Sequence, residues 1–176
     1  MSAIMSTYGR LPVTFASGVG AYLTDQKGEQ YLDALSGIAV TNLGHSHSSV
    51  TRAITEQAES LLHTSNLYGI AQQERLATEL NQLTGMERIF FCNSGAEANE
   101  TAIKMARRHG HNKGITNPQI VVLEGAFHGR TMGALSATDN SAIQAAFKPL
   151  LLSLIHISEP TRRRGISYAV FCVKKK

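Results

Sequence analysis

Two short apolar runs, Ile89–Cys92 and Ile120–Leu123, constrain the fold most, because each is suited to a buried strand. Between them lies a stretch with helical periodicity, from about Glu97 to His109, that Gly110 closes. Strand, helix and strand in this order predict a βαβ unit, and therefore a parallel sheet with helices packed on it. We expect a protein of the α/β class.

The N-terminal part of the chain predicts a β-hairpin. Its strands are expected at Gly20–Asp25 and Glu29–Ala34, on either side of a tight turn in which Gly28 can take a positive φ.

Two helices are expected after the hairpin. The first covers Val50–Leu62, where apolar residues recur at helical spacing and Ser48 or Ser49 is available as the N-cap. The second runs from about Gln72 to Leu83, and Gly85 stops it.

Composition excludes several classes of protein. Of the 176 residues 43% are hydrophobic and 17% charged, which is typical of a globular chain rather than a disordered one. Two cysteines, Cys92 and Cys172, cannot form a disulfide framework or a four-cysteine zinc site. No apolar run reaches the roughly 18 residues of a membrane span, and no secretory signal is recognisable, so we expect a cytoplasmic protein.

The net charge of +4 comes from one end of the chain. Residues 152–176 carry six basic side chains and one acidic one, whereas residues 1–151 carry 11 basic and 12 acidic ones. A basic tail that binds nucleic acid or an anionic surface is one interpretation. The string from Leu152 to Arg162 also resembles a translated sequencing-library adapter, and we therefore interpret residues 152–176 as a non-native tail with no function and expect no nucleic-acid or membrane partner.

The loop after the first apolar run predicts an anion site. Gly95 permits close approach of the backbone, Ser94 supplies a hydroxyl, and the first turn of the following helix offers free N–H groups and a favourable dipole. Glu97 in the first turn suits the helix dipole as well, so capping alone explains part of the same pattern. No Walker motif and no G-x-G-x-x-G motif follows a strand, which disfavours nucleotide triphosphates and dinucleotides.

The loop after the second apolar run combines an aromatic ring and a guanidinium. Phe127 can stack on a planar cofactor, and Arg130 can bind a substrate carboxylate in bidentate fashion. A core phenylalanine and a surface arginine are the simpler alternative. Because the ends of parallel strands share one sheet edge, both loops should meet there and suit a phosphorylated aromatic cofactor with an amino-acid substrate.

These residues carry a resemblance to a known family. The string Asn93–Glu100, then Phe127–Thr131, together with Gly37–Val40 and Leu43–His45, resembles the class III pyridoxal-phosphate aminotransferases. The resemblance runs from about Thr7 to Leu151. It implies a partial fold-type I architecture, with residues 1–45 in a small domain and residues 46–151 at the start of the large cofactor-binding domain.

The resemblance also implies roles for individual residues. Ser94, Gly95 and Ala96 match the positions that hold the cofactor phosphate, Phe127 the residue stacked on the ring, and Arg130 the one that binds the substrate carboxylate. The cofactor would be pyridoxal 5'-phosphate, and the family forms homodimers. The implied reaction of arginine biosynthesis moves an amino group from N-acetylornithine to 2-oxoglutarate; sister substrates are ornithine, succinylornithine and 4-aminobutyrate.

A catalytic lysine is expected to be absent from the chain. In the family, the lysine that forms the Schiff base with the cofactor lies downstream of the loop that carries Arg130. Lys104 does not match that position, and we interpret it as an ordinary lysine on a helix surface. We therefore expect these 176 residues to be inactive, and a non-catalytic truncated binding protein is a further alternative.

Three further expectations concern histidine, cysteine and apolar surface. His45 and His47, like His109 and His111, have the spacing seen in some metal sites, but no carboxylate lies near them in sequence, so we expect solvated or capping histidines and no metal.

Cys92 is expected to be a buried small hydrophobic residue. An incomplete sheet should leave apolar faces unburied, with a risk of aggregation.

Overall fold

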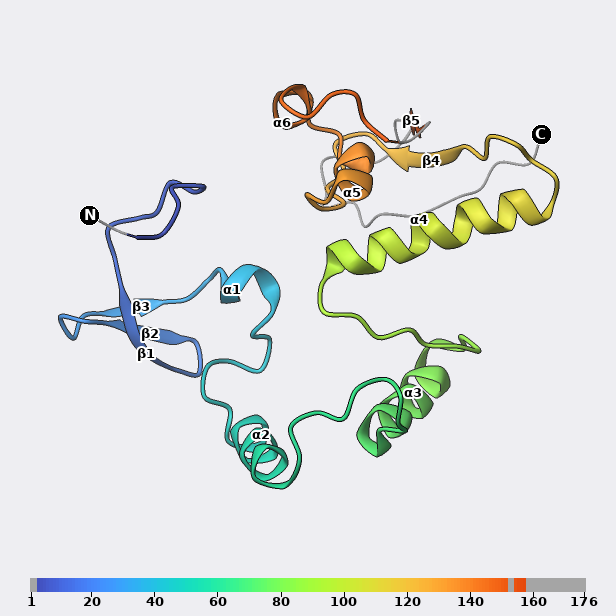
Figure 1. Cartoon of the computed structure of the whole chain (residues 1–176). Helices are drawn as coiled ribbons and strands as arrows, with labels where there is room; N and C mark the ends of the chain where they lie inside the picture. Colours follow the sequence, from blue (N-terminus) through green and yellow to red (C-terminus); the bar gives the residue numbers. More distant parts are fainter. Residues whose placement is uncertain (1–2, 152–153, 158–176) are drawn as a thin grey trace. The chain divides into compact units, whose positions relative to one another are not determined.

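The computed structural model describes residues 3–151 and 154–157, and the chain divides into two compact units, Met1–Glu74 and Arg75–Lys176 (Figure 1). The predicted boundaries at residues 45 and 151 remain predictions. Cys172 and the basic clusters of the C-terminal tail lie outside the described residues.

The first unit contains a three-stranded antiparallel sheet in the order β1-β2-β3. Its strands are β1 (Phe15–Val19), β2 (Tyr22–Asp25) and β3 (Gln30–Leu32). The expected hairpin of β2 and β3 is confirmed, and Gly28 in its turn has a φ of 89°. The sequence did not predict β1, because Ser17 and Gly18 interrupt any alternation of apolar residues.

The Asp25 side chain explains why the hairpin turns where it does. Asp25 Oδ1 accepts hydrogen bonds from the backbone N–H groups of Lys27 (2.8 Å) and Glu29 (2.9 Å). These bonds replace the backbone partners that the turn residues cannot find in the ladder. The Phe15 ring packs edge-on against the Tyr31 ring, with centroids 5.5 Å apart, and so holds β1 against the hairpin.

The first unit continues with α1 (Ser36–Ala39) and α2 (Ser48–Ser60), and α3 (Ala71–Thr84) crosses the boundary between the units. The two longer helices match the predicted ones within a few residues. The expected serine N-cap of α2 is wrong: the N-cap is His47, which makes no capping bond through its side chain. Ser48 and Ser49 already lie within the helix.

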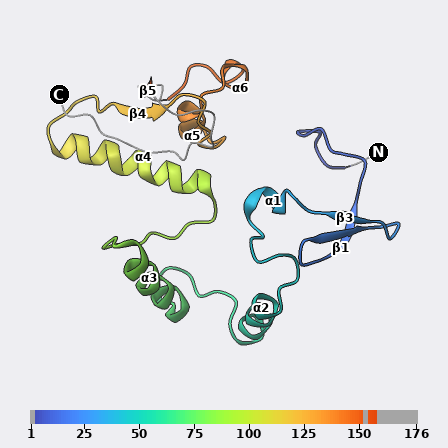
Figure 2. The same cartoon turned by 180° about the vertical axis from the view of Figure 1, so that it is seen from behind.

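The second unit packs a long helix against a strand. Its elements are α4 (Gly95–Asn112), β4 (Ile120–Leu123), α5 (Met132–Ala137), α6 (Ser141–Ala145) and β5 (Leu154–Ile157). Figure 2 shows this arrangement from behind. The core consists of buried side chains from α4, β4 and α5, namely Ile103, Ile120, Val122 and Ala137.

The parallel pairing expected for β4 is present. The partner is β5, with Ile120 opposite Leu154 and Leu123 opposite Ile157. This pairing, with α4 packed on β4, confirms the α/β class. Strand β5 lies in the segment that we interpret as a non-native tail. Strands pair through backbone groups and need no particular side chains, so this pairing does not test the interpretation, which remains a prediction.

The strand expected at Ile89–Cys92 is wrong. These residues lie outside every helix and strand of the described chain, Phe90 is 66% exposed, and Cys92 is exposed rather than buried. A strand forms only where a neighbour offers its backbone groups, and neither sheet of the described chain reaches this segment. The expected βαβ unit therefore forms with its helix and second strand but without the first strand.

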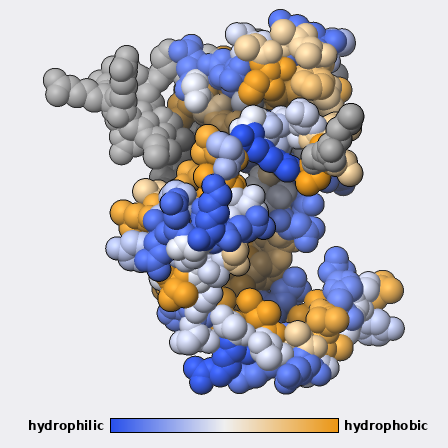
Figure 3. Space-filling view, turned by 90° about the vertical axis from the view of Figure 1, so that its left-hand side faces the viewer, coloured by the Kyte–Doolittle hydropathy of each residue, from blue (hydrophilic) through white to orange (hydrophobic). Residues whose placement is uncertain are grey.

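Apolar side chains remain exposed, as the sequence predicted. Figure 3 shows hydrophobic residues at the surface of one face. On α2 they line an open groove of about 580 Å³. Six of its lining residues come from the apolar stripe that the sequence displays over Val50–Leu62, namely Val50, Ala53, Ile54, Ala58, Leu61 and Leu62. Within residues 3–151 and 154–157, no helix has the length and hydropathy needed to cross a membrane.

Candidate active site

The candidate site begins at the N-terminus of α4. Ser94 is the N-cap residue, and its Oγ accepts a hydrogen bond from the N–H of Glu97 (3.2 Å). The Glu97 carboxylate reaches back to the backbone N–H of Asn93 (2.7 Å). This reciprocal capping starts the helix directly after the extended segment, and it explains why serine and glutamate stand at this spacing.

The capping leaves two backbone donors available for a ligand. In the described part of the chain, the N–H groups of Gly95 and Ala96 make no hydrogen bond. Gly95 is exposed, and a Cβ atom placed on it would meet nothing within 4 Å. Two free N–H groups at the positive end of a helix dipole, with open space in front of them, suit a phosphate.

The second predicted loop, residues 124–131, lies against this helix end. A Cβ atom on Gly129 would lie 3.0 Å from the Cβ of Ala96. Asn99 on α4 donates a hydrogen bond from Nδ2 to the backbone oxygen of His128 (2.5 Å). The two loops therefore meet as expected, but not at a shared sheet edge, because the segment before the first loop is not a strand.

The residues that follow α5 hold the same loop from its other side. Asp139 accepts from the N–H of Gly125 through Oδ2 (2.8 Å) and donates its own N–H to the Ala126 oxygen (3.0 Å). Thr138, which is 2% exposed, accepts from the N–H of His128 through Oγ1 (2.9 Å). The loop is thus tied down along its length even though it contains no helix or strand.

A carboxylate on α4 fixes the start of α5. Glu100 Oε1 accepts from the Thr131 hydroxyl (2.5 Å) and from the N–H of Ala134 (3.1 Å). The Glu100 carboxylate lies directly over Gly133, where an added Cβ would come within 2.6 Å of its oxygens. Together these contacts join α4, the loop and α5 into one structure.

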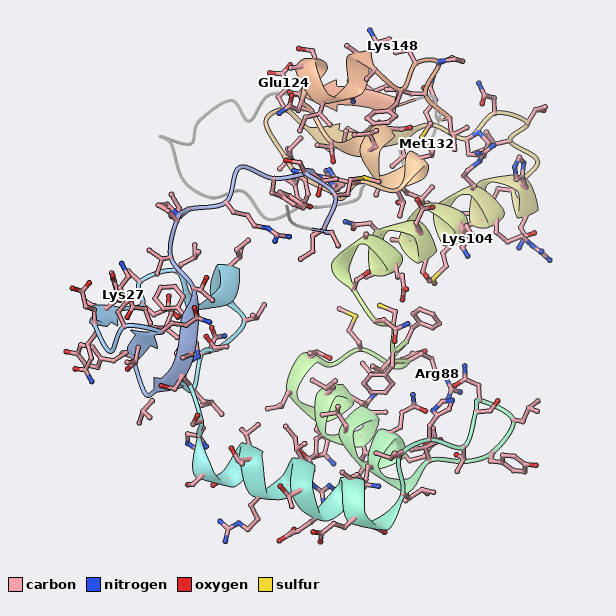
Figure 4. The ribbon with its side chains drawn as sticks, turned by 60° about the vertical axis from the view of Figure 1, so that its left-hand side comes forward. Lys27, Arg88, Lys104, Glu124, Met132 and Lys148 are labelled. Atoms are coloured by element: carbon pink, nitrogen blue, oxygen red, sulfur yellow. The ribbon has the colours of Figure 1, made fainter. Side chains whose placement is uncertain are left out.

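The two side chains predicted to contact a cofactor and a substrate are both accessible. Phe127 is 65% exposed, and Arg130 is exposed as well, although the residues beside them, Ala126 and His128, are buried. An exposed phenylalanine on a rigid loop offers a flat apolar face to a planar ligand. Lys104 is exposed on α4 (Figure 4), as expected for a lysine on a helix surface.

A hydrogen-bonded pair of histidine and aspartate in the first unit was not predicted. His45 Nε2 lies 2.6 Å from Asp33 Oδ2, and the two side chains are 22% and 7% exposed. The hydrogen bond from His45, followed by the one from the Ser36 N–H, lowers the pKa of the Asp33 carboxyl below its usual value. The expectation of a solvated or capping histidine is therefore wrong for His45, because its carboxylate partner lies 12 residues away in sequence.

His111 at the end of α4 and Cys92 each have a nearby backbone oxygen as a partner. His109 and His111 are exposed in the last turn of α4, and His111 Nδ1 lies 3.1 Å from the Ile115 oxygen. Cys92 Sγ donates to the Ser94 oxygen (3.4 Å). Among the described residues, no group of three or more histidine, cysteine and carboxylate side chains is arranged to hold a metal ion.

Sequence reasoning missed the residues that support the site. Asn99 and Glu100 lie three and four residues after Ala96, on the same helical face. Polar residues three and four positions after a predicted anion site indicate that a loop can pack on that face of the helix. Thr138 and Asp139 carried no comparable signal, since their contacts depend on the path of the chain after α5.

A known protein family matches most of this chain. The family model described as "Aminotransferase class-III" matches residues 4–169. The match includes 18 residues beyond Leu151, and so covers part of the segment interpreted as a tail.

Relatives in several bacteria are similar over most of this chain. Acetylornithine aminotransferase of Nitrosomonas europaea is 57% identical over 157 residues, which are 89% of this chain and 40% of the relative. The enzyme of the same name from Prochlorococcus marinus is 48% identical over 151 residues, 85% of this chain and 36% of the relative. The chain thus spans about 40% of the length of the curated relatives that it matches.

Solved structures share the fold. Ornithine aminotransferase from Toxoplasma gondii matches with a TM-score of 0.83 and 28% identity, over 89% of this chain and 37% of that one. N-acetylornithine aminotransferase from Stenotrophomonas maltophilia matches with a TM-score of 0.64 and 42% identity, over 69% of this chain and 34% of that one.

Proposed function

The chain belongs to the class III aminotransferases, and we propose that it is the N-terminal part of an enzyme that transfers the amino group of N-acetylornithine to 2-oxoglutarate. The observation that carries the proposal is the contact between the two loops. It brings the free N–H groups of Gly95 and Ala96 close to the loop that presents Phe127 and Arg130. The names of the relatives support the amino donor, and a role in arginine biosynthesis is part of the proposal.

Pyridoxal phosphate is the cofactor of this family, and the residues of this chain fit it. Ser94, Gly95 and Ala96 would hold the phosphate, since the helix end offers unpaired N–H groups and open space. Phe127 would lie against the ring. When bound, the group serves as an electron sink for bonds broken at the amino-bearing carbon.

The chain's own residues have binding and positioning roles in this proposal. Arg130 would hold the substrate carboxylate with two parallel N–H donors, which orients the reacting carbon toward the cofactor. Phe127 would exclude water from one face of the ring. Neither role moves a proton, and the lysine that does so in the family is expected downstream.

Lys104 does not supply that lysine. Its side chain is exposed on α4, outside any desolvated pocket of the kind that activates a lysine. We therefore expect the 176 residues alone to be inactive. Adding pyridoxal phosphate to the purified chain and reducing it with borohydride should give no specific labelling, and specific labelling of Lys104 would contradict this expectation.

Ornithine is the second candidate amino donor. The ornithine aminotransferase of Toxoplasma gondii shares the fold over 89% of this chain. Its sequence identity of 28% is well below the 57% shared with the acetylornithine enzyme of Nitrosomonas europaea, which favours the acetylated donor. Succinylornithine and 4-aminobutyrate remain further candidates from the sequence. The cytoplasmic location and the homodimer also remain predictions.

The test is an assay of the complete gene product, expressed from the natural reading frame that encodes this chain. We expect glutamate to form from N-acetylornithine and 2-oxoglutarate, with a higher kcat/KM than with ornithine, succinylornithine or 4-aminobutyrate. Arg130→Ala should raise the KM for the amino donor, because its carboxylate loses the bidentate partner. No glutamate from any of the four donors would contradict the proposed function.

A further inference from the structure

The peptide groups on both sides of His128 are held by side chains from outside the loop. Thr138 Oγ1 accepts the hydrogen bond of the His128 N–H at 2.9 Å. Asn99 Nδ2 donates to the His128 oxygen at 2.5 Å. These two peptide groups join His128 to Phe127 on one side and to Gly129 on the other, so their orientation sets the direction in which the Phe127 ring and the following Arg130 leave the backbone.

Thr138 has a hydroxyl and is buried deeply enough to hold the peptide group between Phe127 and His128. Its hydroxyl can accept one hydrogen bond and donate another, and Oγ1 lies 3.0 Å from the Gly129 oxygen and 3.1 Å from the Ala134 oxygen. The residue is 2% exposed. No water can therefore replace the hydroxyl without rearrangement, and a variant that lacks it removes the hydrogen bond that this hydroxyl accepts from the His128 N–H.

The position of Thr138 is itself well fixed. Gln144 donates from Nε2 to the Thr138 oxygen (2.6 Å) and to the Leu135 oxygen (3.2 Å). The Thr138 N–H bonds to the Ala134 oxygen at the end of α5 (3.0 Å). A hydroxyl held in this way can impose its direction on the loop rather than follow it.

We infer that Thr138 and Asn99 are positioning residues that fix the peptide groups around His128 and thereby hold Phe127 and Arg130 in the geometry that a planar, phosphorylated cofactor and its substrate require. The inference rests on the proposed function, since it assigns Phe127 and Arg130 to cofactor and substrate. Neither positioning residue would touch either molecule. Their effect passes through the backbone of residues 127–130.

The experiment uses Thr138→Val in the complete gene product. Valine keeps the shape and removes the hydroxyl, whereas Thr138→Ser keeps the hydroxyl. The control is Thr55→Val on α2, which also removes a hydroxyl bonded to a backbone oxygen (Thr51, 3.0 Å) but lies in the other unit. The measured quantities are the Kd of pyridoxal phosphate, the visible circular dichroism of the bound cofactor, and the Tm of the protein without it.

We expect Thr138→Val to weaken pyridoxal phosphate binding about tenfold, because a loop that has lost the Thr138 hydrogen bond must be ordered when the cofactor binds. It should also reduce the visible circular dichroism, because a ring that stacks in several orientations gives a weaker signal. Thr138→Ser should restore both quantities, and Thr55→Val should change neither. A purely structural role would lower the Tm but leave the circular dichroism of the bound cofactor as in the wild type.

Asn99→Leu keeps the test decisive if Thr138→Val does not fold. Asn99 is only half-buried, and leucine removes the donor to the His128 oxygen with little change in size. We expect the same loss of affinity and of circular dichroism. Wild-type protein that binds pyridoxal phosphate, with Thr138→Val and Asn99→Leu indistinguishable from Thr55→Val, overturns the inference. Wild-type protein that does not bind pyridoxal phosphate overturns the proposed function instead.

Discussion

Ala96 and Gly129 approach each other so closely that a Cβ atom on Gly129 would lie 3.0 Å from the Cβ of Ala96. One residue lies in the first turn of α4, and the other lies between the two side chains predicted to contact cofactor and substrate. The close approach exists because position 129 has no side chain. It fixes the distance between the free N–H groups of the helix end and the loop.

Gly129→Ala should disrupt this contact. Gly129 has a φ of 129°, and an added Cβ would press on Ala96 and Ala134, so we expect a loss of about 2–4 kcal/mol in the free energy of unfolding. The control is Gly125→Ala in the same loop, where φ is 69° but nothing lies within 4 Å, with an expected cost of about 1–2 kcal/mol. Urea denaturation measures both, and equal costs would show that the contact with α4 is not tight.

Ser94→Ala separates helix capping from phosphate binding. Ser94 Oγ caps α4, and its loss should cost about 1 kcal/mol of stability. Asn140→Ala is the matched control, since Asn140 Oδ1 caps α6 through the Ile143 N–H (3.1 Å) at a helix end with no predicted ligand. Both variants should lower the Tm, but only Ser94→Ala should also raise the Kd of pyridoxal phosphate. A similar Kd in the two variants would limit Ser94 to capping.

Glu100 and Gly133 should be energetically coupled. Glu100→Ala removes the acceptor for Thr131 and Ala134 and should cost about 1–3 kcal/mol. Gly133→Ala displaces the same carboxylate, because its Cβ would come within 2.6 Å of the oxygens. Once Glu100 is absent, Gly133→Ala should cost less.

A double-mutant cycle measures this coupling from the unfolding free energies of the two single variants and the double variant. We expect a coupling energy of about 0.5–3 kcal/mol. Strictly additive costs would show that the carboxylate does not rest on Gly133.

Asp33 should make stability depend on acid pH. Hydrogen bonds from His45 and from the backbone lower the pKa of Asp33 in the folded protein below its usual value of 3.8. A carboxyl whose pKa is lower in the folded state stabilises the fold above its unfolded pKa, and this stability is lost as the pH falls through the folded pKa. The Tm should therefore fall as the pH is lowered below about 3.8.

Asp33→Asn should flatten this part of the profile of Tm against pH. Glu59→Gln on the exposed surface of α2 is the control, and its profile should keep the slope of the wild type. If Asp33→Asn keeps the same slope as well, another carboxyl causes the acid sensitivity.

The parts of the structure that the sequence predicted are those with local causes. The hairpin turn at Asp25, the helix α4 after the Ser94–Gly95 loop and the apolar run of β4 depend on residues close to one another in the chain. Ile89–Cys92 has the composition of a strand. A strand forms only beside a second strand that pairs with it, and the described chain places none there. The amino-acid composition shows that a segment favours a strand, but the tertiary fold decides whether a partner strand lies beside it.

The candidate site also contains residues that the sequence predicted and residues that it did not. Ser94, Gly95, Ala96, Phe127 and Arg130 follow from motifs, and the structure brings their two loops together. Their supports, Asn99 and Thr138, and the pair of His45 with Asp33, depend on contacts across 29, 10 and 12 residues of chain. Such long-range hydrogen bonds leave no periodic pattern, so a single sequence does not display them.

The most direct test of the central claim is calorimetric titration of the complete gene product with deoxypyridoxine phosphate, which lacks the aldehyde and therefore cannot bond to a lysine. It probes the phosphate and ring contacts alone. We predict saturable binding of one ligand per chain that weakens in Ser94→Ala and in Phe127→Ala and that inorganic phosphate competes away. The absence of binding, or binding that neither substitution changes, would contradict the assignment of the end of α4 and the 124–131 loop as the cofactor site.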